Sequence, residues 1–145
     1  MKIVIDSSVW IAGIGSKTGY ASEVIYKCFT STEIEIVISE QILAEVSSNL
    51  CKKLKFENNL ANEAATIIKN LCDYSLTTSP AEEKSIERIK YAPDKHILAL
   101  AQKSKSDYLV TFDRKHLLPL KKYGKVEIVK PKEFIEKLGS DRNKE

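Results

Sequence analysis

The chain has 145 residues, of which 43% are hydrophobic and 30% are charged, and this composition fits one compact domain with a buried core. Its formal charge of +3 is the difference between 23 basic and 20 acidic residues, which is too small to indicate nucleic-acid binding by itself. The first apolar stretch ends at Asp6, no stretch approaches membrane-spanning length, and the three cysteines lack CxxC-type spacing. We therefore expect a cytoplasmic protein without a signal peptide, a membrane segment or a disulfide framework.

The opening stretch predicts a buried strand that ends in an acid. Residues 3–5 form an unbroken β-branched run, which is typical of a central strand in a parallel sheet covered by helices on both faces. Asp6 follows at the carboxyl end of this strand, where open α/β sheets bind their ligands. The alternative is that Asp6 caps the next helix, a role that the two following serines could also fill. A second apolar run that ends in an acid, Asp113, favours a shared site over two separate caps.

The next segment contains three glycines, at positions 13, 15 and 19, which we interpret as a flexible loop. Their spacing matches neither the Walker pattern nor the dinucleotide-binding pattern, so no phosphate-binding loop is expected. Apolar residues at helical spacing predict a helix over 20–29, and residues 34–38 predict the second strand.

A further helix is predicted after Ser39, which can act as its N-terminal cap. Its apolar residues form one stripe, and two acids, Glu40 and Glu45, lie on opposite edges of this stripe. Periodicity does not decide which acid faces the carboxyl edge of the sheet. The helix dipole explains an acid in the first turn such as Glu40, but it does not explain Glu45.

The second half of the chain continues the alternation of helices and strands. Proline followed by an acid, Pro93-Asp94, precedes an alanine-rich apolar run and marks a helix start, so capping is a structural explanation for Asp94. The other elements are predicted from periodicity and from proline positions. They are a helix over 57–71, an edge strand over 74–77, an exposed helical connection over 82–91, strands over 108–112 and 126–129, and a helix over 131–138.

These elements predict an α/β fold, a three-layer α/β/α sandwich around a mostly parallel sheet of about five strands. The domain covers residues 1–138, and residues 139–145 are expected to form a solvated tail. Four acids could converge at the carboxyl edge of the sheet, namely Asp6, Glu45, Asp94 and Asp113. Carboxylates in close proximity raise one another's pKa, and a bound cation relieves this repulsion.

The chemistry of the four acids predicts the kind of cation. Oxygen ligands select hard ions such as Mg²⁺ or Mn²⁺, and the lack of His and Cys ligands at useful spacing argues against zinc. His96 and His116 each lie two or three residues from a candidate acid. We assign both histidines supporting or surface roles, with direct participation in the chemistry as the alternative.

Four short motifs carry these acids. They are Ile5-Asp6-Ser7-Ser8-Val9, Ile42-Leu43-Ala44-Glu45-Val46, Pro93-Asp94-Lys95-His96-Ile97-Leu98-Ala99-Leu100-Ala101 and Leu109-Val110-Thr111-Phe112-Asp113. Each motif is weak alone, but their order and spacing over residues 2–138 resemble those of PIN-domain nucleases, especially the toxin-like VapC branch of prokaryotes. The resemblance implies that Asp6, Glu45, Asp94 and Asp113 are the metal-binding and catalytic acids, with Ser8 and Thr111 as their polar neighbours.

The resemblance also implies an activity. A PIN-like site would hydrolyse a phosphodiester of RNA by in-line attack of a metal-activated water, with Asp94 or Asp113 orienting or deprotonating that water. Basic neighbours of the acids would hold the flanking phosphates. These residues are Lys17, Lys95, Arg114 and Lys115, and an ordinary solvated side chain is the alternative for each. A cognate antitoxin and a homodimer are further expectations from the resemblance.

The chain departs from the usual PIN pattern at two positions. Ser8 stands where an asparagine is frequent, and its hydroxyl still offers an oxygen to the site. Lys115 stands where many members carry another acid, which leaves fewer carboxylates for a second ion. We therefore expect one tightly bound metal ion and a second ion that is recruited with the substrate.

Two other classes of function stay open. A catalytically silent PIN-fold module would bind RNA or protein without cleaving either. A phosphate-handling α/β domain, such as a receiver or a haloacid-dehalogenase-like phosphatase, also begins with a strand that ends in Asp. However, Ser8 replaces the second acid of the phosphatase DxD motif, and no paired acids follow the first strand as a receiver requires. A metal-dependent ribonuclease assay would discriminate between these classes.

Overall fold

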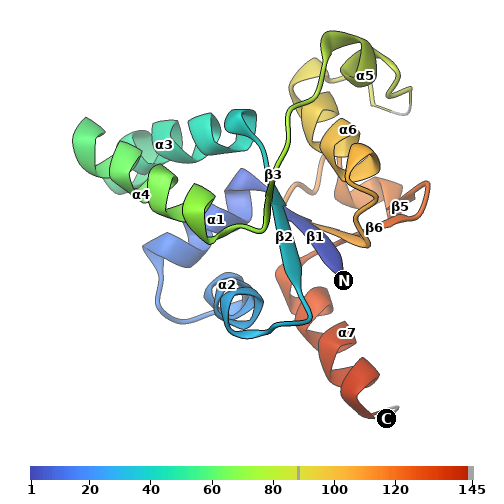
Figure 1. The fold of residues 1–145 in the computed structure, drawn as a ribbon, viewed down its shortest axis with the longest axis horizontal. Helices are drawn as coiled ribbons and strands as arrows, with labels where there is room; N and C mark the ends of the chain where they lie inside the picture. Colours follow the sequence, from blue (N-terminus) through green and yellow to red (C-terminus); the bar gives the residue numbers. More distant parts are fainter. Residues whose placement is uncertain (88, 144–145) are drawn as a thin grey trace.

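The computed structural model describes residues 1–87 and 89–143 (Figure 1). The centre of this part of the chain is a six-stranded sheet with the strand order β3-β2-β1-β4-β6-β5. The strands are β1 (Lys2–Ile5), β2 (Glu35–Ile38), β3 (Tyr74–Ser75), β4 (Tyr108–Val110), β5 (Lys122–Tyr123) and β6 (Val126–Val129). All neighbouring pairs are parallel except β5 and β6, which are antiparallel. The mostly parallel α/β sheet predicted from the sequence is confirmed.

Helices cover both faces of the sheet. The chain moves outward from β1 through β2 to β3 and then returns to β4 on the other side of β1. Because such crossovers are right-handed, the return connection lies on the opposite face from the outward ones. The outward helices are α1 (Ser7–Gly15), α2 (Tyr20–Thr30), α3 (Glu40–Leu54) and α4 (Asn58–Leu71), and α7 (Pro131–Asn143) packs beside α2. The return connection contains α5 (Pro80–Lys84) and α6 (Lys95–Lys103), and α6 packs on β1.

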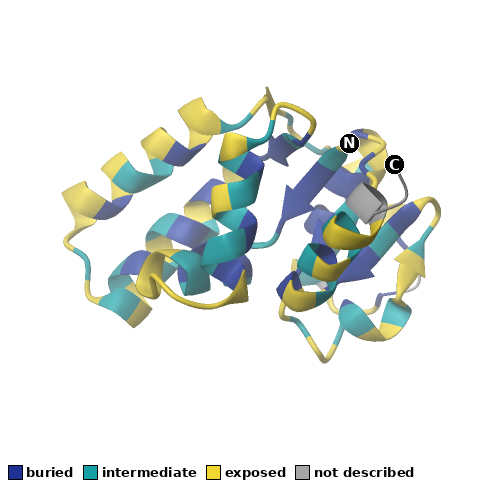
Figure 2. Cartoon of the chain, turned by 90° about the horizontal axis from the view of Figure 1, so that it is seen from below, coloured by how far each residue is buried: buried dark blue, intermediate teal, exposed yellow. Residues whose placement is uncertain are grey.

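The hydrophobic core lies on β1 and its neighbours, where the strands are almost entirely buried (Figure 2). The β-branched residues 3–5 are fully buried, as a central strand requires. Trp10 of α1 is also buried, and its indole N–H donates to the carbonyl of Ile5 at 3.1 Å. The first helix is therefore held against the strand whose end carries Asp6.

One strand of the sheet, β5, was not predicted from the sequence. It contains only Lys122 and Tyr123, so it is too short to show alternation of apolar and polar residues. A turn at Gly124, whose φ is +60°, folds β5 back onto β6. The strand therefore depends on this turn and on pairing with β6, neither of which an apolar pattern reveals.

The predicted glycine loop is wrong for two of its three glycines, because Gly13 and Gly15 lie inside α1. A Cβ on Gly13 would collide with the side chain of Ile25 and crowd the backbone of α2, and a Cβ on Gly15 would press on Leu54 of α3. These glycines therefore allow close packing between helices. Gly19, with φ +116°, is the glycine that the connecting loop requires.

The predicted exposed helical connection over 82–91 is only partly correct. The helix present there, α5, ends at Lys84, and Ser79 and Glu82 form a capping box at its start. Ile86 and Ile89 follow and are buried, so they anchor the irregular segment to the core. Arg88 lies outside the described residues. The segment that leads to Asp94 is therefore fixed by apolar contacts.

The last helix, α7, is longer than predicted, since it continues to Asn143 where the sequence indicates an end near Leu138. Gly139 lies within it and faces open space. A glycine costs a helix only about 1 kcal/mol relative to alanine, so one glycine does not have to end it. Among the described residues, no helix has the length and apolar character needed to cross a membrane.

Candidate functional site

The candidate site lies at the carboxyl ends of β1 and β4, which are neighbours in the sheet. The backbone N–H of Asp6 donates to the carbonyl of Val110 at 2.9 Å, so the last residues of the two strands are joined. Asp6 leaves β1 at this edge, and Thr111 and Asp113 follow β4 at the same edge. The two acids that end apolar runs in the sequence are therefore brought to one place.

Asp6 occupies the N-cap position of α1, but its side chain makes no capping hydrogen bond. Its Oδ2 instead accepts from the hydroxyls of Thr111, at 2.7 Å, and Ser8, at 3.0 Å. Burial raises the pKa of the Asp6 carboxyl, the two hydroxyls act against this rise, and the charge of Glu45 adds to it. Capping therefore does not explain Asp6, and hydroxyl groups hold its carboxylate in the site.

Asp94 ends a short 3-10 turn, Ala92–Asp94, and stands at the N-cap position of α6, again without a side-chain capping bond. Its Oδ2 is buried and has no hydrogen-bond partner among the described residues. Burial and the negative charges of Asp113 and Asp6 raise the pKa of Asp94 to about 6, against the opposing effect of His116. An unpartnered, buried carboxylate oxygen is costly, so it needs a reason other than the start of a helix.

Asp113 has a structural role as well as a place in the site. Its Oδ1 accepts from the backbone N–H groups of Lys115 and His116, both at 3.0 Å, and this forms the turn after β4. Its own N–H donates to the hydroxyl of Thr111 at 3.0 Å. The fully buried Thr111 therefore connects the carboxylate of Asp6 to the backbone of Asp113.

Glu45 reaches the site from α3 and is held by two side chains. Its Oε1 lies 2.5 Å from Nε2 of His96, and its Oε2 accepts from the Ser7 hydroxyl at 2.8 Å. Burial acts to raise the pKa of Glu45. The hydrogen bonds from His96 and Ser7, together with the charge of His96, outweigh burial, so the pKa is lowered. Burial acts to lower the pKa of His96, but the hydrogen bond and the charge of Glu45 outweigh burial, so the pKa of His96 is raised. The other acid of this helix, Glu40, pairs with Lys69 on the surface at 2.5 Å.

The four acids lie in one region, but they do not form a finished metal cage. Within residues 1–87 and 89–143, no group of three or more His, Cys, Asp or Glu side chains is arranged to hold a metal ion. The donor chemistry nevertheless fits a hard cation, because the free positions are carboxylate and hydroxyl oxygens. A cation at Asp94 would also give its buried Oδ2 a partner. Asp6, Asp94 and Asp113 are the residues that fit such an ion, with Glu45 held beside them by His96.

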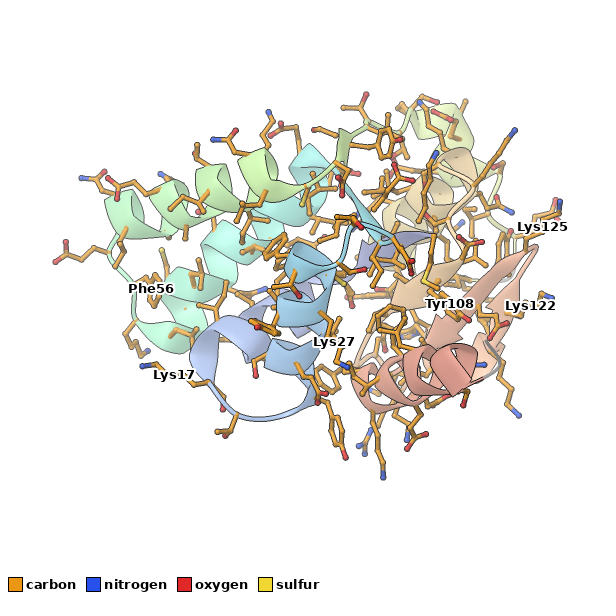
Figure 3. The ribbon with its side chains drawn as sticks, turned by 60° about the horizontal axis from the view of Figure 1, so that its bottom comes forward. Lys17, Lys27, Phe56, Tyr108, Lys122 and Lys125 are labelled. Carbon is orange, nitrogen blue, oxygen red and sulfur yellow. The ribbon has the colours of Figure 1, made fainter. Side chains whose placement is uncertain are left out.

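The four basic residues of interest differ in position. Lys95 begins α6 directly after Asp94, and Arg114 and Lys115 follow Asp113 on an exposed turn. Lys17 lies beyond the far end of α1, and at 1.5 Å per residue the nine-residue helix separates it from Asp6 by about 14 Å. Figure 3 shows Lys17 on the opposite side of the molecule from Lys122 and Lys125. Three of these residues are thus direct sequence neighbours of the acids, whereas Lys17 lies apart.

Two residues that hold Glu45 were not assigned this role from the sequence. Ser7 was considered only as a helix cap, and His96 was given a general supporting role. The available signal for His96 was its position within the apolar face of α6, where it is 8% exposed. A buried histidine needs a polar partner, so this position predicts that some acid or carbonyl faces it, but it does not identify Glu45.

The chain belongs to the PIN-domain family, because the model of that family matches residues 2–115. This match covers all four candidate acids and confirms the resemblance inferred from the motifs. It also assigns the chain to this family rather than to receiver or haloacid-dehalogenase-like domains. A comparison with curated proteins finds no match.

Three solved structures share the fold at low sequence identity. VapC20 of Mycobacterium tuberculosis, a toxin that cleaves the sarcin–ricin loop, is 19% identical with a TM-score of 0.59, covering 86% of this chain and 98% of its own. VapBC-1 of nontypeable Haemophilus influenzae is 12% identical with a TM-score of 0.62, covering 91% and 99%. VapBC2 of Rickettsia felis, bound to promoter DNA, is 14% identical with a TM-score of 0.59, covering 88% and 97%. At these identities the likeness is one of fold.

Proposed function

We propose that this chain is a divalent-metal-dependent endoribonuclease and the toxin component of a type II toxin–antitoxin pair. The observation that carries the proposal is Asp94, whose buried Oδ2 has no partner among the described residues and whose pKa is raised to about 6 by burial and by neighbouring acids. Membership of the PIN family and the shared fold of a sarcin–ricin-loop-cleaving toxin make RNA the substrate to test first. Such an enzyme would act in the cytoplasm.

The proposed metal ligands are Asp6, Asp94 and Asp113, together with Glu45. A bound Mg²⁺ or Mn²⁺ would neutralise these carboxylates and stabilise the negative charge that develops on the phosphoryl group. Asp94 would accept the proton of the attacking water at the carboxylate oxygen that does not hold the ion. The water oxygen would bond to phosphorus while the bond to the leaving oxygen breaks, and the leaving oxygen would take up a proton from solvent.

The basic side chains would hold the RNA. Lys95, Arg114 and Lys115 flank the acids and are proposed to bind phosphates on either side of the scissile bond. Lys17, which lies beyond α1, is proposed to contact a phosphate several nucleotides away. These contacts would position the substrate without reading its sequence.

A catalytically silent PIN-fold module remains the second candidate. The observation that favours it is the lack, within the described residues, of a ready-made group of three metal ligands. The ion pair between His96 and Glu45 could then be structural. The two functions differ in one measurable property, metal-dependent cleavage of RNA.

The test is cleavage of fluorescent single-stranded RNA with Mg²⁺, Mn²⁺ or EDTA. The wild type should cleave only with metal, and Asp94→Asn should lose this activity because its side chain can neither accept the proton nor bind the ion as a carboxylate. Glu40→Gln is the matched control, since Glu40 pairs with Lys69 on the surface. Full activity of Asp94→Asn would overturn the proposed site, and an inactive wild type would favour the silent module.

A protein partner is part of the proposal. Large apolar side chains of α4, Ile67 and Leu71, are 58% and 52% exposed, and Tyr26 of α2 is 69% exposed beside them. Contiguous exposed apolar surface commonly marks a protein interface. VapB partners are present in two of the solved structures with the same fold, which makes a cognate antitoxin and a homodimer the partners to test. Ile67→Glu should prevent co-purification with the antitoxin from a neighbouring gene while leaving RNA cleavage intact.

A further inference from the structure

A groove of about 490 Å³ opens between the segment that precedes α6 and the turn that follows β4. Lys90 and Tyr91 line one side of it, and Lys115 and His116 line the other. The ring of Tyr91 stacks on the imidazole of His116, with centroids 4.7 Å apart and planes inclined by only 13°. Tyr91 is 51% exposed, so this residue stays open to solvent although its ring is stacked on His116.

This aromatic stack is connected to the acids of the candidate site. The backbone N–H of Asp94 donates to the carbonyl of Tyr91 at 3.2 Å. The backbone N–H of His116 donates to Oδ1 of Asp113 at 3.0 Å. The residue that carries each ring is therefore hydrogen-bonded through its backbone to a site acid. These bonds hold the groove in position beside Asp94 and Asp113.

The charges around the groove suit a polyanion. Lys90 and Lys115 are exposed on its two sides, and Arg114 is exposed next to Lys115. Within the described part of the chain, none of these three side chains forms an ion pair with an acid. Single-stranded nucleic acids bind where aromatic rings accept unpaired bases and neighbouring cations hold the phosphates. A wholly apolar ligand fits this groove less well, because its binding would remove water from around two lysine ammonium groups.

We propose that the groove binds one unpaired RNA base stacked on Tyr91, with the flanking phosphates held by Lys90 and Lys115. The stacked base positions the adjacent phosphodiester at Asp94 and Asp113, so the protein selects single-stranded segments of RNA. Bases inside a duplex are stacked on one another and cannot enter the groove. This inference deepens the proposed ribonuclease function and rests on it for the identity of the ligand.

The aromatic contribution is tested by fluorescence anisotropy in EDTA, with a fluorescein-labelled oligo(A) RNA of about 12 nucleotides, within the usual site sizes for single strands. Tyr91→Ala should weaken binding roughly 5- to 100-fold, as expected for the loss of one base stack. Tyr91→Phe should restore binding because it keeps the ring, whereas Tyr91→Leu should not. Tyr20→Ala, which removes another exposed tyrosine at the start of α2, is the matched control and should bind as the wild type does.

The phosphate contacts are tested by salt dependence. Removing Lys90 and Lys115 together should flatten the plot of log affinity against log salt by about 0.7 for each lost contact with a single strand. Tyr91→Ala should leave this slope unchanged, because a stacked base releases no counterions. A blunt RNA duplex of the same length should bind Tyr91→Ala and the wild type equally.

The outcomes separate the two proposals. If Tyr91→Ala binds oligo(A) as tightly as the wild type and both proteins cleave RNA, the groove proposal is overturned and the ribonuclease proposal stands. If binding depends on Tyr91 but no metal-dependent cleavage occurs, the groove is supported and the ribonuclease proposal fails. A wild type that neither binds oligo(A) nor cleaves RNA with metal would overturn both. An equal loss of duplex binding in Tyr91→Ala would overturn the selection of unpaired bases.

Discussion

The two ends of the parallel sheet both carry aspartates, but the carboxylates are used differently. At the amino end, Asp107 and Asp73 precede β4 and β3, and each accepts from a backbone N–H of a neighbouring strand. The Oδ2 of Asp107 accepts from Lys2 at 2.9 Å, and that of Asp73 accepts from Ile36 at 2.8 Å. At the carboxyl end, Asp6 is held by two hydroxyls, and Oδ2 of Asp94 has no partner in the described residues.

This difference distinguishes acids that hold the sheet together from the acids proposed to act in the reaction. A carboxylate that accepts a backbone N–H of the sheet contributes to the stability of the fold. At the carboxyl end, burial instead raises the pKa values of Asp6 and Asp94, and repulsion from neighbouring acids adds to this rise. Carboxylates with raised pKa values cluster at functional sites, which supports the role proposed for these acids. Substitutions at the two ends should therefore affect different properties.

The largest expected effect is on catalysis at the carboxyl end. Asp6→Asn should reduce metal-dependent RNA cleavage on the order of 10²- to 10³-fold or more. The substitution removes a charged metal ligand next to the phosphoryl group, where negative charge develops in the reaction. Asp107→Ala should instead keep the cleavage rate and lower the melting temperature. The hydrogen bond from the N–H of Lys2 is exposed, so its loss should cost about 1 kcal/mol, which corresponds to roughly 2 to 4 °C.

Single-turnover rates with Mn²⁺ and thermal melts of both variants test this separation. Asp107→Asn is the matched control for the amino end, since its amide oxygen can still accept from Lys2. Comparable losses of activity in Asp6→Asn and Asp107→Ala would mean that the two ends are not functionally distinct.

A smaller effect is expected from the side chain that holds Glu45. His96→Leu removes the partner of Oε1 in the buried site, so Glu45 loses its fixed orientation. Outer partners of metal ligands typically contribute 10- to 100-fold to metal affinity, and we expect Mn²⁺ binding measured by calorimetry to weaken by that factor. His96→Gln can still donate to Glu45 and should recover part of the affinity. Unchanged Mn²⁺ binding by a folded His96→Leu would assign the pair to the fold alone.

Much of the fold follows from short-range pattern. The buried strand over residues 2–5, the helix after Ser39 and the strand that leads to Asp113 were predicted because their apolar periodicity is strong and their ends carry cap or acid signals. The glycines at 13 and 15 were misinterpreted because their reason is contact with Ile25 and Leu54. Such contacts between helices are created by tertiary packing, and composition does not encode them locally.

The candidate site was predictable to a more limited extent. Pattern identified Asp6 and Asp94 but left a helix cap and a chemical role as alternatives for each, because both roles occupy the same position at a helix start. The side-chain geometry shows that neither residue caps its helix. The grouping of Ser7, Glu45 and His96 depends on α1, α3 and α6 meeting at one edge, which requires the fold itself.

The smallest expected effect concerns the charge of Asp94 in the metal-free protein. Its ordinary pKa is 3.8, and burial with the charges of Asp113 and Asp6 raises it to about 6. Between these values the folded protein binds a proton that the unfolded chain has lost. The raised pKa therefore contributes stability that is complete below about pH 4 and is lost as the pH rises through about 6.

Thermal melts of the wild type and Asp94→Asn in EDTA, from pH 4 to pH 7, should reveal this loss. The two proteins should melt alike at the acidic end, where Asp94 is protonated and resembles Asn. The variant should melt higher near pH 7 by about 2 to 4 °C, which corresponds to roughly 1 kcal/mol once solvent screening of this half-exposed group is allowed for. Mn²⁺ should reverse the order, because the ion binds the folded wild type more tightly than the variant. A difference that stays constant over this pH range would show that Asp94 is not repelled by its neighbours.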